Sequence, residues 1–161
     1  RGVGNPIGCK VGPMATPEEV LEICEAINPA RIPGRLTLIS RMGADKVEDG
    51  LRPLLRAVRD AGHPVVWACD PMHGNTFTSA GGRKTRDFES IISEIEGFVR
   101  SHRAEQTWPG GDVTEGVGGG DALRDTDLDT RYETVCDPRL NGRQSIELAF
   151  RTADLIRNGD A

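Results

Sequence analysis

The chain has 161 residues, which suits one domain and falls short of the roughly 200–250 residues of an ordinary eight-fold βα barrel. The formal net charge is −5 and no block of Lys and Arg stands out, which disfavours a general nucleic-acid role. No apolar run approaches the roughly 20 residues needed to cross a membrane, and no signal peptide opens the sequence. The 20 Gly and 10 Pro residues predict many turns.

The four cysteines favour reduced thiols in a cytoplasmic protein over disulfides. They are Cys9, Cys24, Cys69 and Cys136, none belongs to a C-x-x-C pair, and the chain is not rich in Cys. A structural zinc site is therefore disfavoured. The chain opens on Arg1 with no initiator Met, as in a processed protein or a piece of a longer one.

The first elements are two strands separated by a helix. Residues 7–11 read as a short strand, and Thr16 followed by Pro17 and Glu19 predicts a helix that starts with a capping box. An apolar stripe at helical spacing continues this helix until Asn28-Pro29 stops it. Residues 36–40 then read as a buried strand.

A second helix and a third strand follow. The helix is expected within 45–61, with Pro53 marking a restart or kink and Gly62 ending it in a left-handed cap. Residues 64–69 form the third expected strand.

The next segment is expected to be a long polar loop, 74–86, followed by the clearest helix of the sequence, about 87–102. Apolar residues recur along this helix at helical spacing. They are Phe88, Ile91, Ile92, Ile95, Phe98 and Val99.

The remaining sequence has a weak region and two more elements. Residues 107–131 are Gly-rich with little periodicity and read as a loop within the domain. Residues 132–136 read as a fourth strand, and Asn141 can cap a last helix over about 143–157. Its apolar residues are expected to face inward: Ile146, Ala149, Phe150 and Ala153.

Strands that alternate with amphipathic helices indicate parallel βαβ units with right-handed crossovers. The fold class is therefore α/β, with about four parallel strands in one domain over residues 1–161.

In parallel α/β folds, ligands bind at the carboxyl ends of the strands. Each expected strand delivers a charged or metal-capable residue there: Lys10, Arg41, His73 and Asp137. Four such residues from four strands indicate one shared site.

Lys10 and Arg41 are the cationic pair of this site. An Arg fork suits a carboxylate or phosphate, and a Lys offers a point charge, so the pair predicts a small anionic ligand. The alternative is that each cation pairs with a structural Asp or Glu. The place of Lys10 in an apolar strand favours the functional reading, because burying an unpaired cation is costly.

His73 and Asp137 are the metal-capable pair. An imidazole and a carboxylate suit Mn²⁺, Co²⁺, Fe²⁺ or Zn²⁺, but two ligands are too few for a tight site. The alternatives are a hydrogen-bonded loop His and an Asp that caps a turn, since Cys-Asp-Pro occurs at both 69–71 and 136–138. His63 and His102 receive no role; His102 is placed on the polar side of its helix. The Gly-rich stretch 81–84 lacks the spacing of a phosphate loop, and 118–120 is interpreted as a flexible segment in preference to a nucleotide site.

Five stretches of the sequence carry a family resemblance: NPIGCKVGP, PGRLTLISRMGADKV, GHPVVWACDPMHGNT, GGRKTR and YETVCDPRLNGRQSIELAF. They resemble class II 3-deoxy-D-arabino-heptulosonate 7-phosphate (DAHP) synthases. These enzymes are transferases that condense phosphoenolpyruvate with erythrose 4-phosphate, the first step of the shikimate pathway leading to aromatic amino acids. The resemblance implies a partial TIM barrel, with strands equivalent to strands four, five, six and eight.

The resemblance also implies site roles. Lys10 and Arg41 match the family's phosphoenolpyruvate-binding Lys and Arg, and are the candidate catalytic and substrate-binding residues. His73 and Asp137 match its metal-binding His and Asp, which implies a divalent metal, Mn²⁺ or Co²⁺, held weakly if at all.

The chain departs from the family pattern in two places. Only the carboxyl-terminal part of the barrel is covered, so the family's metal-binding Cys and the residues expected to hold erythrose phosphate have no counterpart. The motif Pro109-Gly110-Gly111 also runs directly into Asp112-Val113-Thr114-Glu115, without the seventh strand and its metal-binding Glu.

Two functions stay open. The first is a DAHP synthase-like enzyme whose catalysis is impaired in this short chain. The second is a non-catalytic homologue that acts as a partner or regulatory subunit, or as a phosphometabolite-binding module. A partial barrel exposes strand edges, so a homodimer or a partner chain is expected to cover them.

Overall fold

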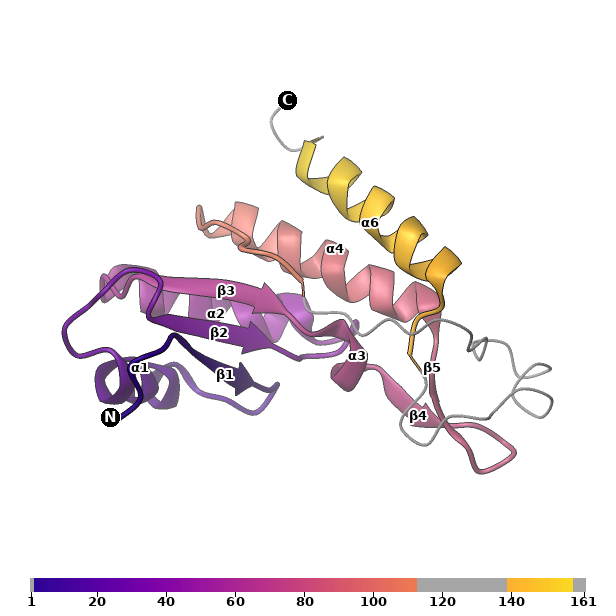
Figure 1. Cartoon of the computed structure of the whole chain (residues 1–161), viewed down its shortest axis with the longest axis horizontal. Helices are drawn as coiled ribbons and strands as arrows, with labels where there is room; N and C mark the ends of the chain where they lie inside the picture. The colour runs from indigo at the N-terminus through magenta and orange to yellow at the C-terminus, as the bar shows by residue number, and fades with distance from the viewer. Residues whose placement is uncertain (1, 113–138, 158–161) are drawn as a thin grey trace.

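A computed structural model describes residues 2–112 and 139–157. Its centre is a parallel sheet of β1 (Ile7–Val11), β2 (Leu36–Ser40) and β3 (Val65–Cys69), in that spatial order. The register places Ile7 beside Leu36 and Leu36 beside Val65. The three strands lie where the sequence predicts them, and their carboxyl ends reach the same edge of the sheet (Figure 1).

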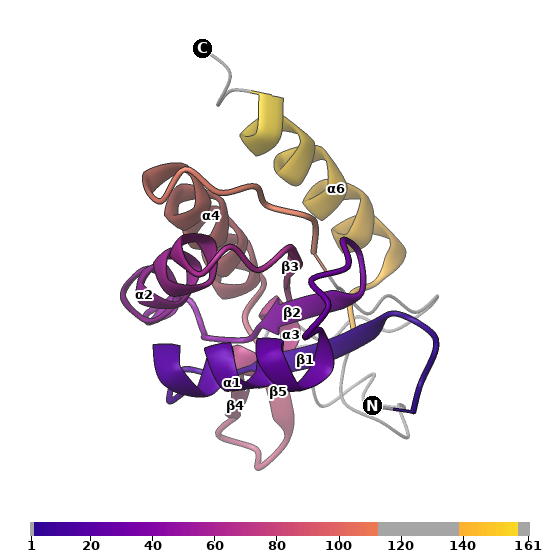
Figure 2. The ribbon, with the colours of Figure 1, turned by 90° about the vertical axis from the view of Figure 1, so that its left-hand side faces the viewer.

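The helices α1 (Pro17–Ile27), α2 (Val47–Asp60) and α4 (Phe88–Ala104) cover one face of this sheet (Figure 2). Side chains alternate between the two faces of a strand. In β2, Leu36, Leu38 and Ser40 are therefore buried under the helices, whereas Thr37 and Ile39 on the opposite face are only half-buried. Within the residues that the structure describes, the fold is an α/β sheet with one covered face and one open face.

Local signals in the sequence account for the helix boundaries. Thr16 and Glu19 form the predicted capping box at the start of α1, and Asn28 ends that helix. Gly62 follows α2 with a φ of 67°, the left-handed conformation expected of it. The expected restart at Pro53 was wrong: α2 runs through it, because Pro53 is exposed and Leu51 and Leu54 anchor the helix on both sides.

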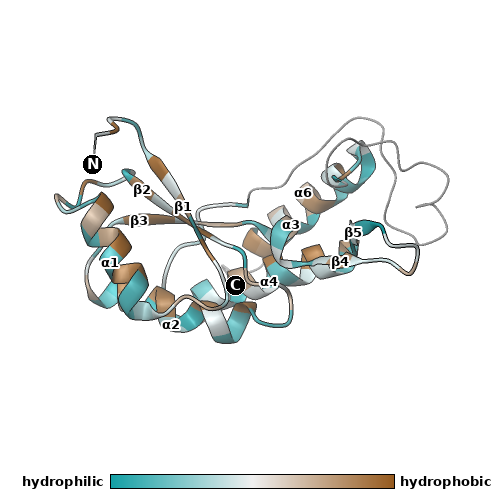
Figure 3. Cartoon of the chain, turned by 90° about the horizontal axis from the view of Figure 1, so that it is seen from below, coloured by the Kyte–Doolittle hydropathy of each residue, from teal (hydrophilic) through white to brown (hydrophobic). Residues whose placement is uncertain are grey.

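The segment expected to be a polar loop, 74–86, contains an antiparallel hairpin of β4 (Thr76–Thr78) and β5 (Lys84–Arg86). A short helix, α3 (Pro71–Gly74), leads from β3 into this hairpin. The hairpin closes through Ser79, whose amide donates to the Arg83 carbonyl at 2.8 Å. These strands are short and polar, so hydrophobic periodicity does not reveal them; Figure 3 contrasts the hydrophilic β5 with the mostly hydrophobic β3.

The start of the expected Gly-rich loop lies along the outer edge of β3. The Gly110 amide donates to the Trp67 carbonyl, and the Cys69 amide donates to the Gly111 carbonyl, both at 2.9 Å. Asp112 forms a parallel bridge with Cys69. The expected fourth strand, 132–136, and most of the loop lie outside the described residues.

The last helix, α6 (Gly142–Arg157), packs against α4 (Figures 1 and 2). Asn141 caps it: its side chain accepts from the Gln144 amide at 2.9 Å, and the Gln144 side chain accepts from the Asn141 amide at 3.0 Å. No helix of the described ranges has both the length and the hydropathy that a membrane span requires.

The expected inward face of α6 was wrong. Leu148 is buried and Leu155 is partly buried in the core, whereas the residues expected there are exposed: Ile146, Ala149, Phe150 and Ala153. The helix carries apolar residues on two opposite sides. Within the described chain, only the side with Leu148 and Leu155 packs against the core. We call the exposed set of four residues the outer stripe of α6.

Candidate anion- and metal-binding site

The carboxyl ends of the three strands bring three of the predicted site residues to one edge of the sheet. Lys10 is the penultimate residue of β1, Arg41 directly follows β2, and His73 lies in α3 just after β3. Asp137, the fourth predicted residue, lies outside the described residues.

Asp70, between β3 and α3, connects two of these residues. Its Oδ2 atom lies 2.7 Å from Lys10 Nζ, and both of its carboxylate oxygens lie 2.8 Å from His73 Nδ1. Asp70 also caps α3, because its Oδ1 accepts from the Met72 amide at 3.2 Å and from the His73 amide at 3.3 Å. One carboxylate thus joins a residue of β1 to a residue of the helix that follows β3.

The Asp70 side chain is almost fully buried. Burial alone would raise its pKa, but the hydrogen bonds from Lys10 and His73 outweigh that effect and hold the pKa below its ordinary value. Asp70 is therefore a carboxylate at neutral pH, and it places negative charge between the ammonium and the imidazole.

The structure of the Lys10 side chain agrees in part with both interpretations of the sequence, a structural ion pair and a cation available to a ligand. It pairs with an acidic residue, as the structural alternative holds, but its side chain is 48% exposed on the open face, so the expected burial of the cation was wrong. An ammonium has three donor hydrogens, and Asp70 takes one of them. Two donors remain for a ligand.

Arg41 is held loosely. Its Nη2 atom donates to the His73 carbonyl at 3.4 Å, a long hydrogen bond. Across residues 2–112 and 139–157, no carboxylate forms an ion pair with it. The guanidinium group is half-buried at the rim. Unlike Lys10, it has no carboxylate partner among the described residues.

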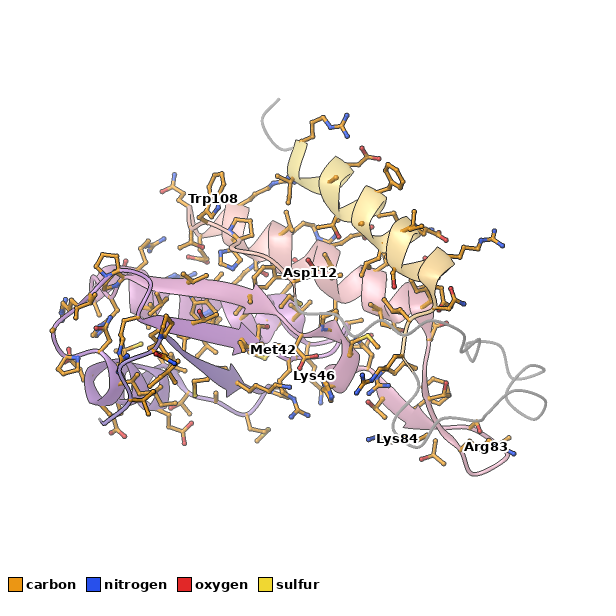
Figure 4. The ribbon with its side chains drawn as sticks, viewed as in Figure 1. Met42, Lys46, Arg83, Lys84, Trp108 and Asp112 are labelled. Carbon is orange, nitrogen blue, oxygen red and sulfur yellow. The ribbon has the colours of Figure 1, made fainter. Side chains whose placement is uncertain are left out.

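A buried carboxylate fixes the two loops that carry Arg41 and His73. Glu94 of α4 is fully buried; its oxygens accept from the Met42 amide at 2.8 Å and from Asn75 Nδ2 at 2.7 Å. Asn75 completes the link, because its Oδ1 accepts from the Ala44 amide at 2.9 Å. Burial raises the pKa of Glu94 above its ordinary value, although these hydrogen bonds oppose the rise. Figure 4 shows Met42 at this end of β2.

His73 presents one nitrogen for a metal. Nδ1 is engaged by Asp70, while Nε2 has no hydrogen-bond partner among the described residues, and the side chain is 28% exposed. In metal sites, the ligating His commonly gives its other ring nitrogen to a carboxylate. No group of three metal-capable side chains exists within the described part of the chain, so a metal at His73 would need further ligands from outside that part.

The other two histidines lie away from this rim. His102, expected on a polar side of its helix, is instead fully buried against Phe98 and Trp67, and its Nδ1 lies 2.8 Å from Thr107 Oγ1. His63 is buried, with Nε2 3.3 Å from a Glu25 carboxylate oxygen. Arg83 and Lys84 lie on the β4–β5 hairpin, away from the sheet (Figure 4).

The three cysteines of the described residues form no disulfide with one another. Cys9, Cys24 and Cys69 are free thiols. Burial raises the pKa of Cys24 to about 11 and that of Cys69 well above its ordinary value, so both remain protonated.

Sequence reasoning missed the partner role of Asp70 and the whole role of Glu94. Asp70 was visible as a polar residue after a strand, in the sequence Asp-Pro that starts many helices. Glu94 carried one usable signal: it lies in α4 between the apolar residues Ile92 and Ile95, where an acidic side chain is out of place.

The fold is an α/β protein whose parallel sheet gathers two cations, an imidazole and a buried carboxylate at its carboxyl edge. Residues 1–153 match the model of the class-II DAHP synthetase family. The chain therefore belongs to that family.

Curated relatives from bacteria and a plant agree with this assignment. The chain is 50% identical to phospho-2-dehydro-3-deoxyheptonate aldolase AroG of Mycolicibacterium smegmatis, with 97% of the chain and 35% of the relative covered. It is 50% identical to the aldolase of Streptomyces coelicolor, covering 97% and 36%, and 48% identical to a probable chloroplastic aldolase of Catharanthus roseus, covering 100% and 32%. The chain spans about a third of the length of these relatives.

The first alignment also contains positions without a counterpart here. It runs over 164 positions although it covers 97% of a 161-residue chain. Some aligned residues of the relative are therefore absent from this chain.

Proposed function

We propose that this chain supplies the phosphoenolpyruvate-binding part of a DAHP synthase-like site that condenses phosphoenolpyruvate with erythrose 4-phosphate. The observation that carries the proposal is the convergence of Lys10, Arg41 and His73 on one rim of the sheet. Family membership supplies the reaction class. A cytoplasmic location, consistent with the free thiols, is part of the same proposal.

Lys10 and Arg41 bind the anionic groups of phosphoenolpyruvate in this proposal. The Arg41 fork suits two oxygens of a carboxylate or phosphate, and the two unused donors of Lys10 suit a second anionic oxygen. Both cations approach from separate strands, so a ligand that bridges them is held at two points and its reacting carbon is oriented.

His73, together with Asp137, is the proposed divalent-metal pair, with Mn²⁺ or Co²⁺ as the metals expected. The free Nε2 of His73 and the carboxylate behind its Nδ1 fit this role. A bound metal would supply Lewis-acid polarisation of the acceptor's aldehyde oxygen.

The short chain is expected to catalyse this reaction poorly. The sequence lacks counterparts for two of the family's four metal ligands and for the residues that hold the acceptor sugar phosphate. Positioning of reactants is worth roughly 7–11 kcal/mol of a reaction barrier, so an unplaced acceptor reacts slowly.

Binding of phosphoenolpyruvate is the direct test of the anion site. Arg41→Ala should weaken binding about ten- to a hundred-fold, because a charge-assisted hydrogen bond contributes roughly 1.5–3 kcal/mol. Isothermal titration calorimetry measures this. Arg100→Ala is the matched control, because Arg100 pairs with Glu48 on the helical layer. Equal binding by the wild type and Arg41→Ala would remove Arg41 from the site.

An assay with both substrates separates the impaired enzyme from the non-catalytic homologue. Loss of phosphoenolpyruvate is followed with added Mn²⁺ or Co²⁺, first for the chain alone and then with a polypeptide that supplies the missing strands. Slow turnover that rises with the second polypeptide supports the proposal. Rapid turnover by the chain alone, abolished by His73→Ala, would contradict the expected impairment.

A further inference from the structure

We propose that Asp70 is a positioning residue that fixes His73 in the form with its proton on Nδ1, and so leaves Nε2 as the ligating atom. The same carboxylate holds the Lys10 ammonium at the rim. The metal at Nε2 rests on the proposed function. The tautomer of His73 and the contact with Lys10 rest on the geometry of this chain.

In the hydrogen bond between Asp70 and His73, the carboxylate accepts and the imidazole donates. An ionised carboxylate only accepts hydrogen bonds, so a neutral imidazole held 2.8 Å from both of its oxygens must donate from Nδ1. The Nε2 lone pair then has no described protein partner. A free lone pair on a ring that is fixed at its other nitrogen is suited to a metal.

The position of Asp70 is itself fixed from two directions. The amides of Met72 and His73 donate to Oδ1 from the first turn of α3. Lys10 donates to Oδ2 from β1, which lies two strands away from β3 because β2 separates them. The carboxylate therefore has little freedom to rotate away from His73.

Capping alone does not account for this arrangement. Asp87 caps the much longer α4 through Oδ2, which accepts from the Ser90 amide at 2.8 Å. The Asp87 side chain is exposed, and it bonds to no titratable group within residues 2–112 and 139–157. Asp70 is buried and also contacts the side chains of Lys10 and His73. Asp87 thus provides a matched control for the capping role.

The first test measures the His73 tautomer in the metal-free chain by ¹⁵N NMR of the imidazole nitrogens. The pH is kept where the ring is neutral, and the signals are assigned with His73→Gln. The wild type should show a protonated Nδ1 and an unprotonated Nε2. Asp70→Asn should weaken this preference, because a neutral amide keeps only one acceptor oxygen and its NH2 group cannot accept from Nδ1, whereas Asp87→Asn should keep it.

A wild-type His73 protonated at Nε2, or an unchanged tautomer in folded Asp70→Asn, would overturn the proposal. The wild-type measurement decides the first point without any variant, so a failure of Asp70→Asn to fold does not remove the test.

The second test titrates Co²⁺ alone into the wild type and the two variants and follows its visible absorption. Asp70→Asn should bind Co²⁺ about 10–100-fold more weakly, and Asp87→Asn should match the wild type. Equal affinity of Asp70→Asn and the wild type would overturn the positioning role. Absence of Co²⁺ binding in the wild type would instead count against the proposed metal function, while the tautomer still decides the role of Asp70.

Discussion

Gly74 lies where the loop after β3 touches the loop after β2. A Cβ atom added to Gly74 would stand 2.4 Å from the Gly43 nitrogen and 2.9 Å from its Cα, both of which are backbone atoms. It would also meet Glu94 Oε2 at 3.1 Å, the group that holds the two loops together. The glycine is therefore needed for the close approach of the Arg41 and His73 segments.

We expect Gly74→Ala to lower the free energy of unfolding by about 1–3 kcal/mol, because the backbone must shift to relieve the contact. Urea denaturation measures this change. Gly12→Ala is the control, since Gly12 also follows a strand but has no atom within 4 Å of its added Cβ. Equal stability of the two variants would show that the loops separate at little cost.

His102 gives the protein a pH-dependent stability. Burial lowers its pKa from 6.5 to about 4. Between pH 6.5 and pH 4, the imidazole is therefore protonated in the unfolded chain and neutral in the folded chain. The contribution of the neutral His102 is present above pH 6.5 and is lost as the pH falls toward 4. The linkage amounts to at most about 3 kcal/mol.

His102→Gln should therefore flatten the dependence of unfolding free energy on pH between 6.5 and 4. Denaturant melts at several pH values, compared with the wild type, provide the measurement. The same slope in both proteins would assign the acid sensitivity to other groups.

In a parallel sheet, the residues that follow the strands lie at one edge, and this expectation places Lys10, Arg41 and His73 correctly. It does not predict what each side chain touches there. Lys10 and Asp70 are 60 residues apart in the sequence, and their ion pair exists only because β1 and β3 flank β2. Glu94 acts on loops around residues 42 and 75, which helical periodicity does not relate to it.

At the scale of elements, strong hydrophobic patterns were predictable and polar ones were not. The strands β1, β2 and β3 and the helices α1, α2, α4 and α6 follow from apolar runs, helical spacing and caps. The β4–β5 hairpin has three-residue strands with exposed Phe77, and nothing in its composition separates it from a loop. Periodicity also shows that α6 has an apolar side, but not which of its two apolar sides meets α4.

The two sides of α6 should respond differently to substitution. Leu148→Ala should cost about 2–4 kcal/mol of unfolding free energy, because Leu148 is buried in the core. Phe150→Ser changes an exposed residue of the outer stripe and should stay within about 0.5 kcal/mol. Chemical denaturation of the two variants tests this, and a large loss in Phe150→Ser would mean that the stripe is covered within the chain.

At the scale of the whole molecule, the described residues leave the sheet open on one side and at one edge. Within the described chain no strand pairs with the outer edge of β1, and a groove of about 480 Å³ runs between this strand and α1, past Lys10 and Ile23. Parallel sheets are normally covered on both faces, and free strand edges promote association. We propose that a second copy or a partner chain covers these surfaces.

Light scattering should therefore give a mass above the 17.4 kDa of one chain, with a dependence on concentration. Ile146→Ser combined with Phe150→Ser should lower the mass if the outer stripe contributes to the contact. A folded wild type that stays monomeric at all concentrations would contradict the proposed association.

The outer stripe of α6 also gives such an association a particular dependence on temperature. Contacts made by Phe150 and Ile146 are apolar, and the hydrophobic driving force weakens on cooling because it is entropic near room temperature. Ion pairs such as Lys10–Asp70 do not share this behaviour. An assembly that uses the stripe should come apart in the cold while the rim of each chain stays intact, so chilling offers a way to obtain the site in single chains.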